Sequence, residues 1–151
     1  ACNTSHCFLP DIYRNVPEAE GKIISIIDAC CMEIAAASER HVSLIASEGT
    51  IQSRVFHQAL QPYGIEVSVP VAEQYLKQRE LIEAVKQNRI TGETLDAFVQ
   101  MIRSFSGDAL ILGCTEFPVL FSKLPEGALN GIRIYDPLRS AIKVLWKTCK
   151  Y

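Results

Sequence analysis

The chain has 151 residues, of which 48% are hydrophobic and 21% charged, the balance of a globular protein and not of a disordered one. A formal net charge of −2 without a run of lysine or arginine argues against a nucleic-acid partner. The longest apolar runs fall far short of the roughly 20 residues that cross a bilayer, and no signal peptide is visible. We therefore expect a cytoplasmic protein with no membrane attachment.

Short β-branched runs alternate with segments of helical periodicity along the whole chain. Strands are predicted at residues 22–27, 41–46, 65–69, 109–113 and 132–135. Helices are predicted at residues 5–15, 29–39, 49–61, 71–87, 91–105, 117–124 and 137–149, with turns at 17–21 and 106–108. This order predicts an α/β fold, in which helices cover both faces of a parallel sheet.

Three polar residues stand where predicted helices begin. Asp28 and Asp136 are expected to cap the helices that follow them, and Pro137 suits a first helical position. Thr91 opens a TGET segment that predicts a capping box.

The six cysteines do not suggest disulfides or a metal site. They form no Cys-x-x-Cys pair, and their spacing to the histidines does not resemble that of zinc ligands. Free thiols in a reducing compartment are the better interpretation, and we predict no metal.

Two of these cysteines share one local context. Cys2 lies in ACNTSH and Cys114 in LGCTEFP, each beside hydroxyl-bearing residues where a helix begins. Cys114 follows the most hydrophobic predicted strand, and ligands of parallel sheets bind beyond the carboxyl ends of the strands. A thiol placed there can exchange protons with a bound ligand, although a lone cysteine at a strand end is more often a core residue. The pattern alone leaves both interpretations open.

The segments CNTSH and LGCTEFPVL resemble the two motifs of the aspartate/glutamate racemase superfamily, in the same order. Thr50 stands near the family's Gly-Thr turn, where this chain departs by having Ala46-Ser47. The resemblance implies racemisation without pyridoxal phosphate, metal or any other cofactor, with Cys2 and Cys114 as the acid-base pair.

The same resemblance implies the residues that bind substrate. They are Asn3, Thr4, Thr50, Thr115 and Glu116. Because Glu116 is typical of the aspartate-racemase branch, aspartate is favoured over glutamate as the small-molecule substrate.

The resemblance also implies two pseudo-symmetric Rossmann-like lobes, of which this chain holds one and part of the other. Residues 1–27 would be the C-terminal part of the first lobe, with its front missing. Residues 28–135 would be the complete second lobe, and 136–151 a closing helix that returns to the first. A homodimer is also expected, because dimers are common in the family.

Two alternatives stay open. The chain could be a truncated, non-catalytic α/β domain that binds a small carboxylate or associates with itself. It could also be a related cysteine isomerase, of the maleate or hydantoin type.

Overall fold

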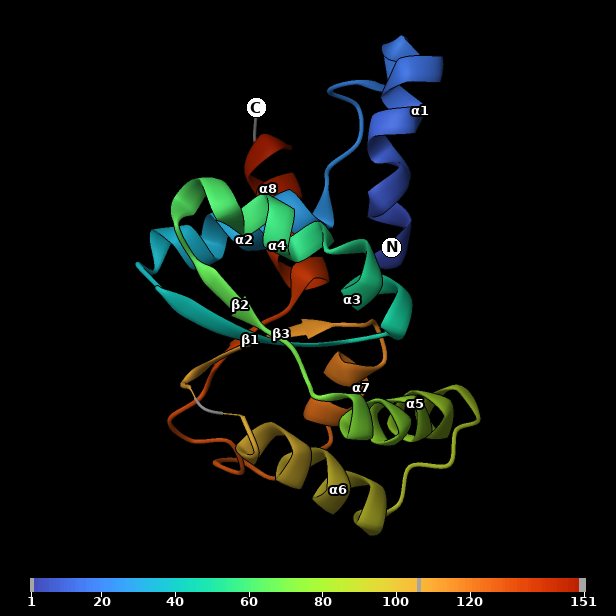
Figure 1. Ribbon diagram of the computed structural model, residues 1–151, viewed down its shortest axis with the longest axis vertical. Helices are drawn as coiled ribbons and strands as arrows, with labels where there is room; N and C mark the ends of the chain where they lie inside the picture. Colours follow the sequence, from blue (N-terminus) through green and yellow to red (C-terminus); the bar gives the residue numbers. More distant parts are fainter. Residues whose placement is uncertain (1, 106, 150–151) are drawn as a thin grey trace.

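The computed structural model of the chain describes residues 2–105 and 107–149 (Figure 1). Its strands are β1 (His41–Ala46), β2 (Glu66–Ser68), β3 (Ala109–Gly113) and β4 (Arg133–Tyr135). Its α-helices are α1 (Leu9–Asn15), α2 (Ile26–Ala36), α3 (Glu48–Ser53), α4 (Val55–Leu60), α5 (Ala72–Lys86), α6 (Gly92–Arg103), α7 (Phe117–Phe121) and α8 (Pro137–Thr148). Short 3-10 helices are η1 (Thr4–Phe8), η2 (Pro17–Ala19) and η3 (Gln61–Tyr63).

The four strands form one sheet in the order β2-β1-β3-β4, and every pairing is parallel. The two central strands, β1 and β3, have the bounds that the sequence predicts, because their apolar runs are buried almost throughout. In their register Ala46 lies opposite Gly113, so both strands end at the same edge of the sheet. The α/β prediction is confirmed.

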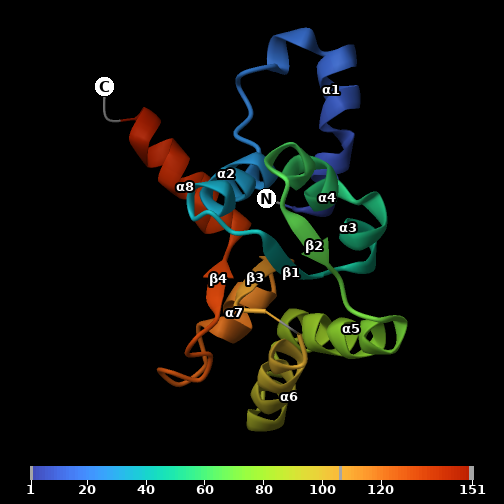
Figure 2. The ribbon, with the colours of Figure 1, turned by 60° about the vertical axis from the view of Figure 1, so that its left-hand side comes forward.

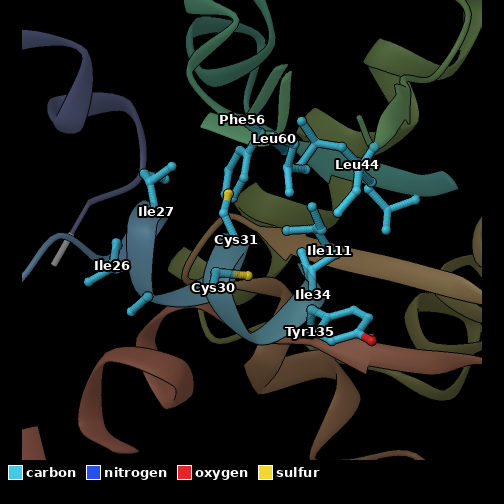
Figure 3. Packing of buried hydrophobic residues seen from close by; sticks show 14 of the residues in the cluster. Ile26, Ile27, Cys30, Cys31, Ile34, Leu44, Phe56, Leu60, Ile111 and Tyr135 are labelled. Carbon is cyan, nitrogen blue, oxygen red and sulfur yellow. The ribbon is translucent and has the colours of Figure 1, made fainter. Parts of the chain in front are cut away.

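Helices cover both faces of this sheet (Figures 1 and 2). Alternating side chains of the central strands divide the core into two clusters. Leu44 and Ile111 pack with α2 and α4, as Figure 3 shows, whereas Ile45, Leu110 and Leu112 pack with α5, α6 and α7. Each such side chain contributes about 1.5–3 kcal/mol by leaving water.

The strand predicted at residues 22–27 is wrong. Residues 23–25 are coil and bend, and α2 begins at Ile26. None of the four strands of the described sheet pairs with this β-branched run, and Ile23 and Ile24 are 38% and 37% exposed. The Asp28 cap is also wrong: the Ser25 side chain accepts the hydrogen bond from the Asp28 backbone N–H.

The helix predicted at residues 49–61 is divided in two. Arg54 has φ 54°, in the left-handed region, and separates α3 from α4. No glycine or proline marks the break, so local sequence offered no signal for it.

The other predicted caps are confirmed. Thr91 and Thr94 exchange side-chain and backbone hydrogen bonds at the start of α6. The Asp136 carboxylate accepts from the backbone N–H groups of Leu138 and Arg139 at 3.0 and 3.3 Å. Of the turn predicted at 106–108, residue 106 lies outside the described residues.

None of the helices in the described ranges is long and apolar enough to cross a membrane.

The helix α8 packs against α2 on one face of the sheet, in both ribbon views (Figures 1 and 2). Glu33 on α2 accepts from the Ser140 hydroxyl at 2.8 Å and pairs with the Lys143 ammonium at 2.6 Å. The opposite side of α8 exposes large apolar side chains, as does the N-terminal segment. They are Leu138, Ile142 and Leu145 on α8, and Phe8, Ile12, Val16, Ile23 and Ile24 before α2.

Gly113 ends β3 where a side chain has no room. A Cβ there would lie 2.6 Å from Leu44 Cδ1 and 3.1 Å from the Ile45 carbonyl oxygen. We expect Gly113→Ala to lower the free energy of unfolding by about 1–3 kcal/mol through overpacking. Gly92→Ala, which has open space around its Cβ, should leave it unchanged or raise it by up to about 1 kcal/mol. Urea denaturation measures both, and equal stability of the two variants would contradict the expectation.

Candidate active site

The candidate site lies at the edge where β1 and β3 end together. Ser47 follows β1 and Cys114 follows β3, directly after the paired residues Ala46 and Gly113. This is the edge at which parallel α/β sheets bind ligands, because loops and helix N-termini gather there. The pairing of the two strands therefore places Ser47 close to Cys114.

Three hydroxyl groups meet at this edge. Thr4 Oγ1 lies 3.1 Å from Ser47 Oγ and 2.7 Å from Thr50 Oγ1, and the latter two atoms are 3.0 Å apart. Thr50 is only 1% exposed. The triangle joins the N-terminal segment to α3 and brings Thr4 and Thr50 into direct contact.

Gly49 makes this approach possible. A Cβ at Gly49 would lie 3.0 Å from Thr4 Cγ2, so a larger residue would push η1 away from α3.

Cys2 is exposed, and hydrogen bonds lower the pKa of its thiol. The hydroxyl of Ser5 is the largest cause, followed by the backbone of Ser5; Thr4 adds a smaller contribution. His6 fixes this segment, since its Nε2 accepts from the Ile26 backbone N–H at 3.2 Å. The proton is then on Nδ1, which donates to the Cys2 carbonyl at 2.8 Å. We assign His6 a structural role.

Cys114 has the opposite electrostatic environment. Its thiol donates to Glu116 Oε2 at 2.9 Å, and the Thr115 hydroxyl donates to the same oxygen at 3.0 Å. Burial and then the Glu116 carboxylate raise the pKa of Cys114 to about 12, although backbone hydrogen bonds from Glu116 and Ser47 oppose this in part. Burial alone would raise the pKa of Glu116, but the hydrogen bonds from Cys114 and Thr115 outweigh it and lower that pKa.

The two thiols thus differ in their readiness to lose a proton. Cys2 is shifted toward the thiolate and Cys114 toward the protonated thiol.

The structure brings the predicted residues together in two groups. Thr4 and Thr50 share the hydroxyl triangle, and the other group is Cys114, Thr115 and Glu116. Ser47 connects them, because its hydroxyl belongs to the triangle and its backbone hydrogen-bonds to the Cys114 sulfur.

Cys2 and Asn3 lie beside Thr4 in the chain. Asn3 is buried, and its Oδ1 has no hydrogen-bond partner among the described residues.

A cavity of about 260 Å³ opens beside these groups, between the end of β1 and the helix α5. Its lining residues are Ala46, Ser47, Glu48, Gly49, Tyr75, Gln78, Arg79, Ile82, Glu83 and Lys86. The α5 residues were absent from the sequence prediction, since nothing local distinguishes polar side chains of a helix that face a site. Ser47 is named in the sequence analysis only as a departure from the family's Gly-Thr turn, and its place directly after a buried strand was a signal for including it among the site residues. Within residues 2–105 and 107–149, no three acidic, histidine or cysteine side chains converge as metal ligands.

A parallel sheet covered by helices, with polar residues and a cysteine directly after its central strands, defines a class of α/β proteins that bind ligands at this edge. Residues 1–145 match the family described as Asp/Glu/Hydantoin racemase, and the chain belongs to that family.

Two curated relatives are glutamate racemases. That of Koribacter versatilis is 30% identical over 158 residues, which cover 97% of this chain and 50% of the relative. The glutamate racemase of Aquifex aeolicus is 29% identical, and the match covers 96% of this chain and 55% of the relative. The chain thus spans about half the length of the curated relatives it matches.

Solved structures show the same fold. An aspartate racemase homologue from Pyrococcus horikoshii is 25% identical with a TM-score of 0.79, covering 99% of this chain and 65% of that one. A glutamate racemase from Francisella tularensis in complex with D-glutamate is 21% identical with a TM-score of 0.72. The match covers 97% of this chain and 54% of that one.

The contact between Glu116 and Cys114 predicts a change in thiol reactivity. In Glu116→Gln the pKa of Cys114 should fall, because a negative charge beside the sulfur is removed. Its alkylation by iodoacetamide at pH 8 should rise about tenfold for each unit by which the pKa falls. Peptide mass spectrometry resolves the sites, and Cys2 should react faster than Cys114 in the unaltered protein. Glu126→Gln, at an exposed position, is the control; equal Cys114 rates in both variants would refute the coupling.

Proposed function

We propose that the protein racemises an acidic amino acid without pyridoxal phosphate, by a two-base mechanism between Cys2 and Cys114. The observation that carries this proposal is geometric: Cys114 directly follows β3, and Ser47, whose backbone hydrogen-bonds to the Cys114 sulfur, holds the segment of Cys2 through its contact with Thr4 at 3.1 Å. The pKa values of the two thiols, lowered at Cys2 and raised at Cys114, agree with different roles for the two groups. Membership of the Asp/Glu/Hydantoin racemase family supports it.

In one direction the Cys2 thiolate takes the α-proton, which leaves a carbanion at the α-carbon and a neutral thiol at Cys2. Cys114 then gives its proton to the opposite face of that carbon and becomes a thiolate. Each step moves one proton, and substrate of the other hand uses the same steps in reverse. The Cys114 thiolate formed beside the Glu116 carboxylate is unfavourable, so it readily takes a proton back.

The remaining predicted residues would hold the substrate. Asn3, Thr4, Thr50 and Thr115 offer amide and hydroxyl groups to the α-carboxylate and amino group, while Glu116 carries the charge that pairs with an ammonium. Four of the five lie in the two hydrogen-bonded groups at the strand ends.

We further propose the two-lobed organisation, with residues 28–135 as one lobe, 1–27 as part of the other and 136–151 as the helix that returns to it. The exposed apolar side chains of α8 and of the segment before α2 support this, because such faces are normally covered. The same exposed faces favour, as a second candidate, a domain that binds a small carboxylate and pairs with another copy.

Proton exchange at the α-carbon tests the thiol mechanism. With L-aspartate in deuterated water, the protein should form D-aspartate that carries deuterium at Cα. Cys114→Ser should lower the rate by about 100- to 10,000-fold, the usual contribution of a positioned acid or base. Cys149→Ser removes an exposed thiol at the C-terminal end of α8 and is the control. Unchanged racemisation in Cys114→Ser would sink the mechanism.

The substrate preference is a separate prediction. We expect kcat/KM for aspartate to exceed that for glutamate, following the identity of residue 116. Chiral chromatography of both products measures this. Faster turnover of glutamate would instead agree with the names of the curated relatives, and turnover of maleate or a hydantoin alone would assign a different reaction.

A further inference from the structure

A groove of about 640 Å³ follows the helix α4 beside the edge strand β2, and the two elements are in contact (Figures 1 and 2). Glu66, one of its lining residues, pairs with His41 at the start of β1, whereas the candidate active site follows the ends of β1 and β3. The groove therefore extends toward the opposite edge of the sheet, and its lining residues are not those of the candidate active site.

Four side chains that can donate hydrogen bonds line this groove. They are Arg54, His57, Gln58 and Gln61. In the part of the chain that the structure describes, none of the four has a hydrogen-bond or ion-pair partner for its side chain. A guanidinium group carries five N–H donors and each amide carries two, so the groove offers many donors that only a ligand or water can meet.

The imidazole of His57 presents one of its nitrogen atoms to the groove. Its Nδ1 is enclosed without a partner, whereas Nε2 is not enclosed, and the ring lines the groove. Burial, and then the charge of Arg54, lower the pKa of His57, so the ring is neutral at neutral pH. Because an enclosed N–H without an acceptor costs more than an enclosed lone pair, the proton is assigned to Nε2. His57 thus adds a neutral donor beside the charge of Arg54.

The acidic lining residue, Glu66, does not face these donors. Side chains alternate along the extended chain, and Ile65 and Val67 on either side of Glu66 pack in the core cluster that contains the buried residues of α4. The Glu66 side chain therefore points to the other face of the sheet, away from α4. Among the lining residues, Arg54 thus brings a positive charge to the α4 side of the groove without a carboxylate on that side.

We propose that this groove binds the phosphate group of a small molecule, with Arg54 as the charged contact and His57 Nε2 as a neutral donor. Phosphate fits these donors because its oxygens accept several hydrogen bonds and the planar guanidinium can meet two of them at once. The amides of Gln58 and Gln61 would meet the remaining phosphate oxygens, or the hydroxyl groups of a phosphate ester. This site is separate from the proposed racemase function, and it requires no turnover.

A titration followed by two-dimensional NMR tests the site. Inorganic phosphate, glucose 6-phosphate and glucose are added separately at constant ionic strength, so that general screening of charge stays the same. Both phosphates should give saturable shifts in the backbone amides of residues 54–67, and glucose none. Tighter binding of glucose 6-phosphate would assign a phosphate ester as the ligand, and tighter binding of inorganic phosphate the free ion. Shifts that do not saturate, or that are largest outside the groove, would overturn the proposal.

Arg54→Asn removes the charged contact. Asparagine tolerates the left-handed backbone of this position, where φ is 54°, better than most residues do. The affinity for inorganic phosphate should fall about 10- to 100-fold, the usual effect of losing a hydrogen bond to a charged group. Arg14→Asn is the matched control, since it removes the same charge from an exposed arginine that pairs with Asp11 outside the groove. Equal affinity in the two variants rejects the proposal.

His57→Phe separates binding from folding. The ring is kept and both nitrogens are lost, but Nδ1 has no partner, so the fold loses no hydrogen bond. The melting temperature should therefore not fall, while phosphate should bind about 2- to 10-fold more weakly. Unchanged affinity in a folded His57→Phe variant would contradict the proposed contact with Nε2. Because these measurements follow binding alone, they stand or fail independently of the deuterium experiment.

Discussion

The parallel pairing of β1 with β3 is the constraint on which the site depends. Their register brings Ala46 and Gly113 side by side, and each is followed directly by a polar residue, Ser47 or Cys114. Both strands are buried on both faces, so a slip in register would move apolar side chains out of their clusters. The packing of the core thus fixes the positions of the site residues at the strand ends. At Gly113 the core leaves no room even for a Cβ atom.

The thiols of Cys2 and Cys114 are the same functional group, but their surroundings shift their pKa values in opposite directions. Cys2 sits near the surface among hydrogen-bond donors, whereas Cys114 is partly buried beside a carboxylate. The same functional group therefore favours its thiolate in one place and its thiol in the other. In the proposed mechanism this difference would make Cys2 the first base and Cys114 the first acid, and the neighbours that create it, Ser5 for Cys2 and Glu116 for Cys114, lie within a few residues of each thiol.

Sequence reasoning was strongest where local pattern and tertiary structure agree. The bounds of β1 and β3 are correct because buried apolar runs leave little choice, and the caps at Thr91 and Asp136 follow from side chains acting on their own helix. The strand predicted at residues 22–27 was wrong because β-branched residues form a strand only where a neighbouring strand is present to pair with them. The break at Arg54 depends on distant packing, so it had no local signal.

In the triangle of Thr4, Ser47 and Thr50, the number of hydroxyl hydrogens limits what the group can donate to a ligand. Three hydroxyl groups own three hydrogens, and the three oxygen–oxygen contacts use all of them when the ring is closed. A closed ring presents only lone pairs to its surroundings, so it accepts an ammonium group as it stands. A carboxylate must instead turn one hydroxyl outward and give up one bond of the ring. The polarity of this corner is therefore set by the direction of its hydroxyl groups and not by a formal charge.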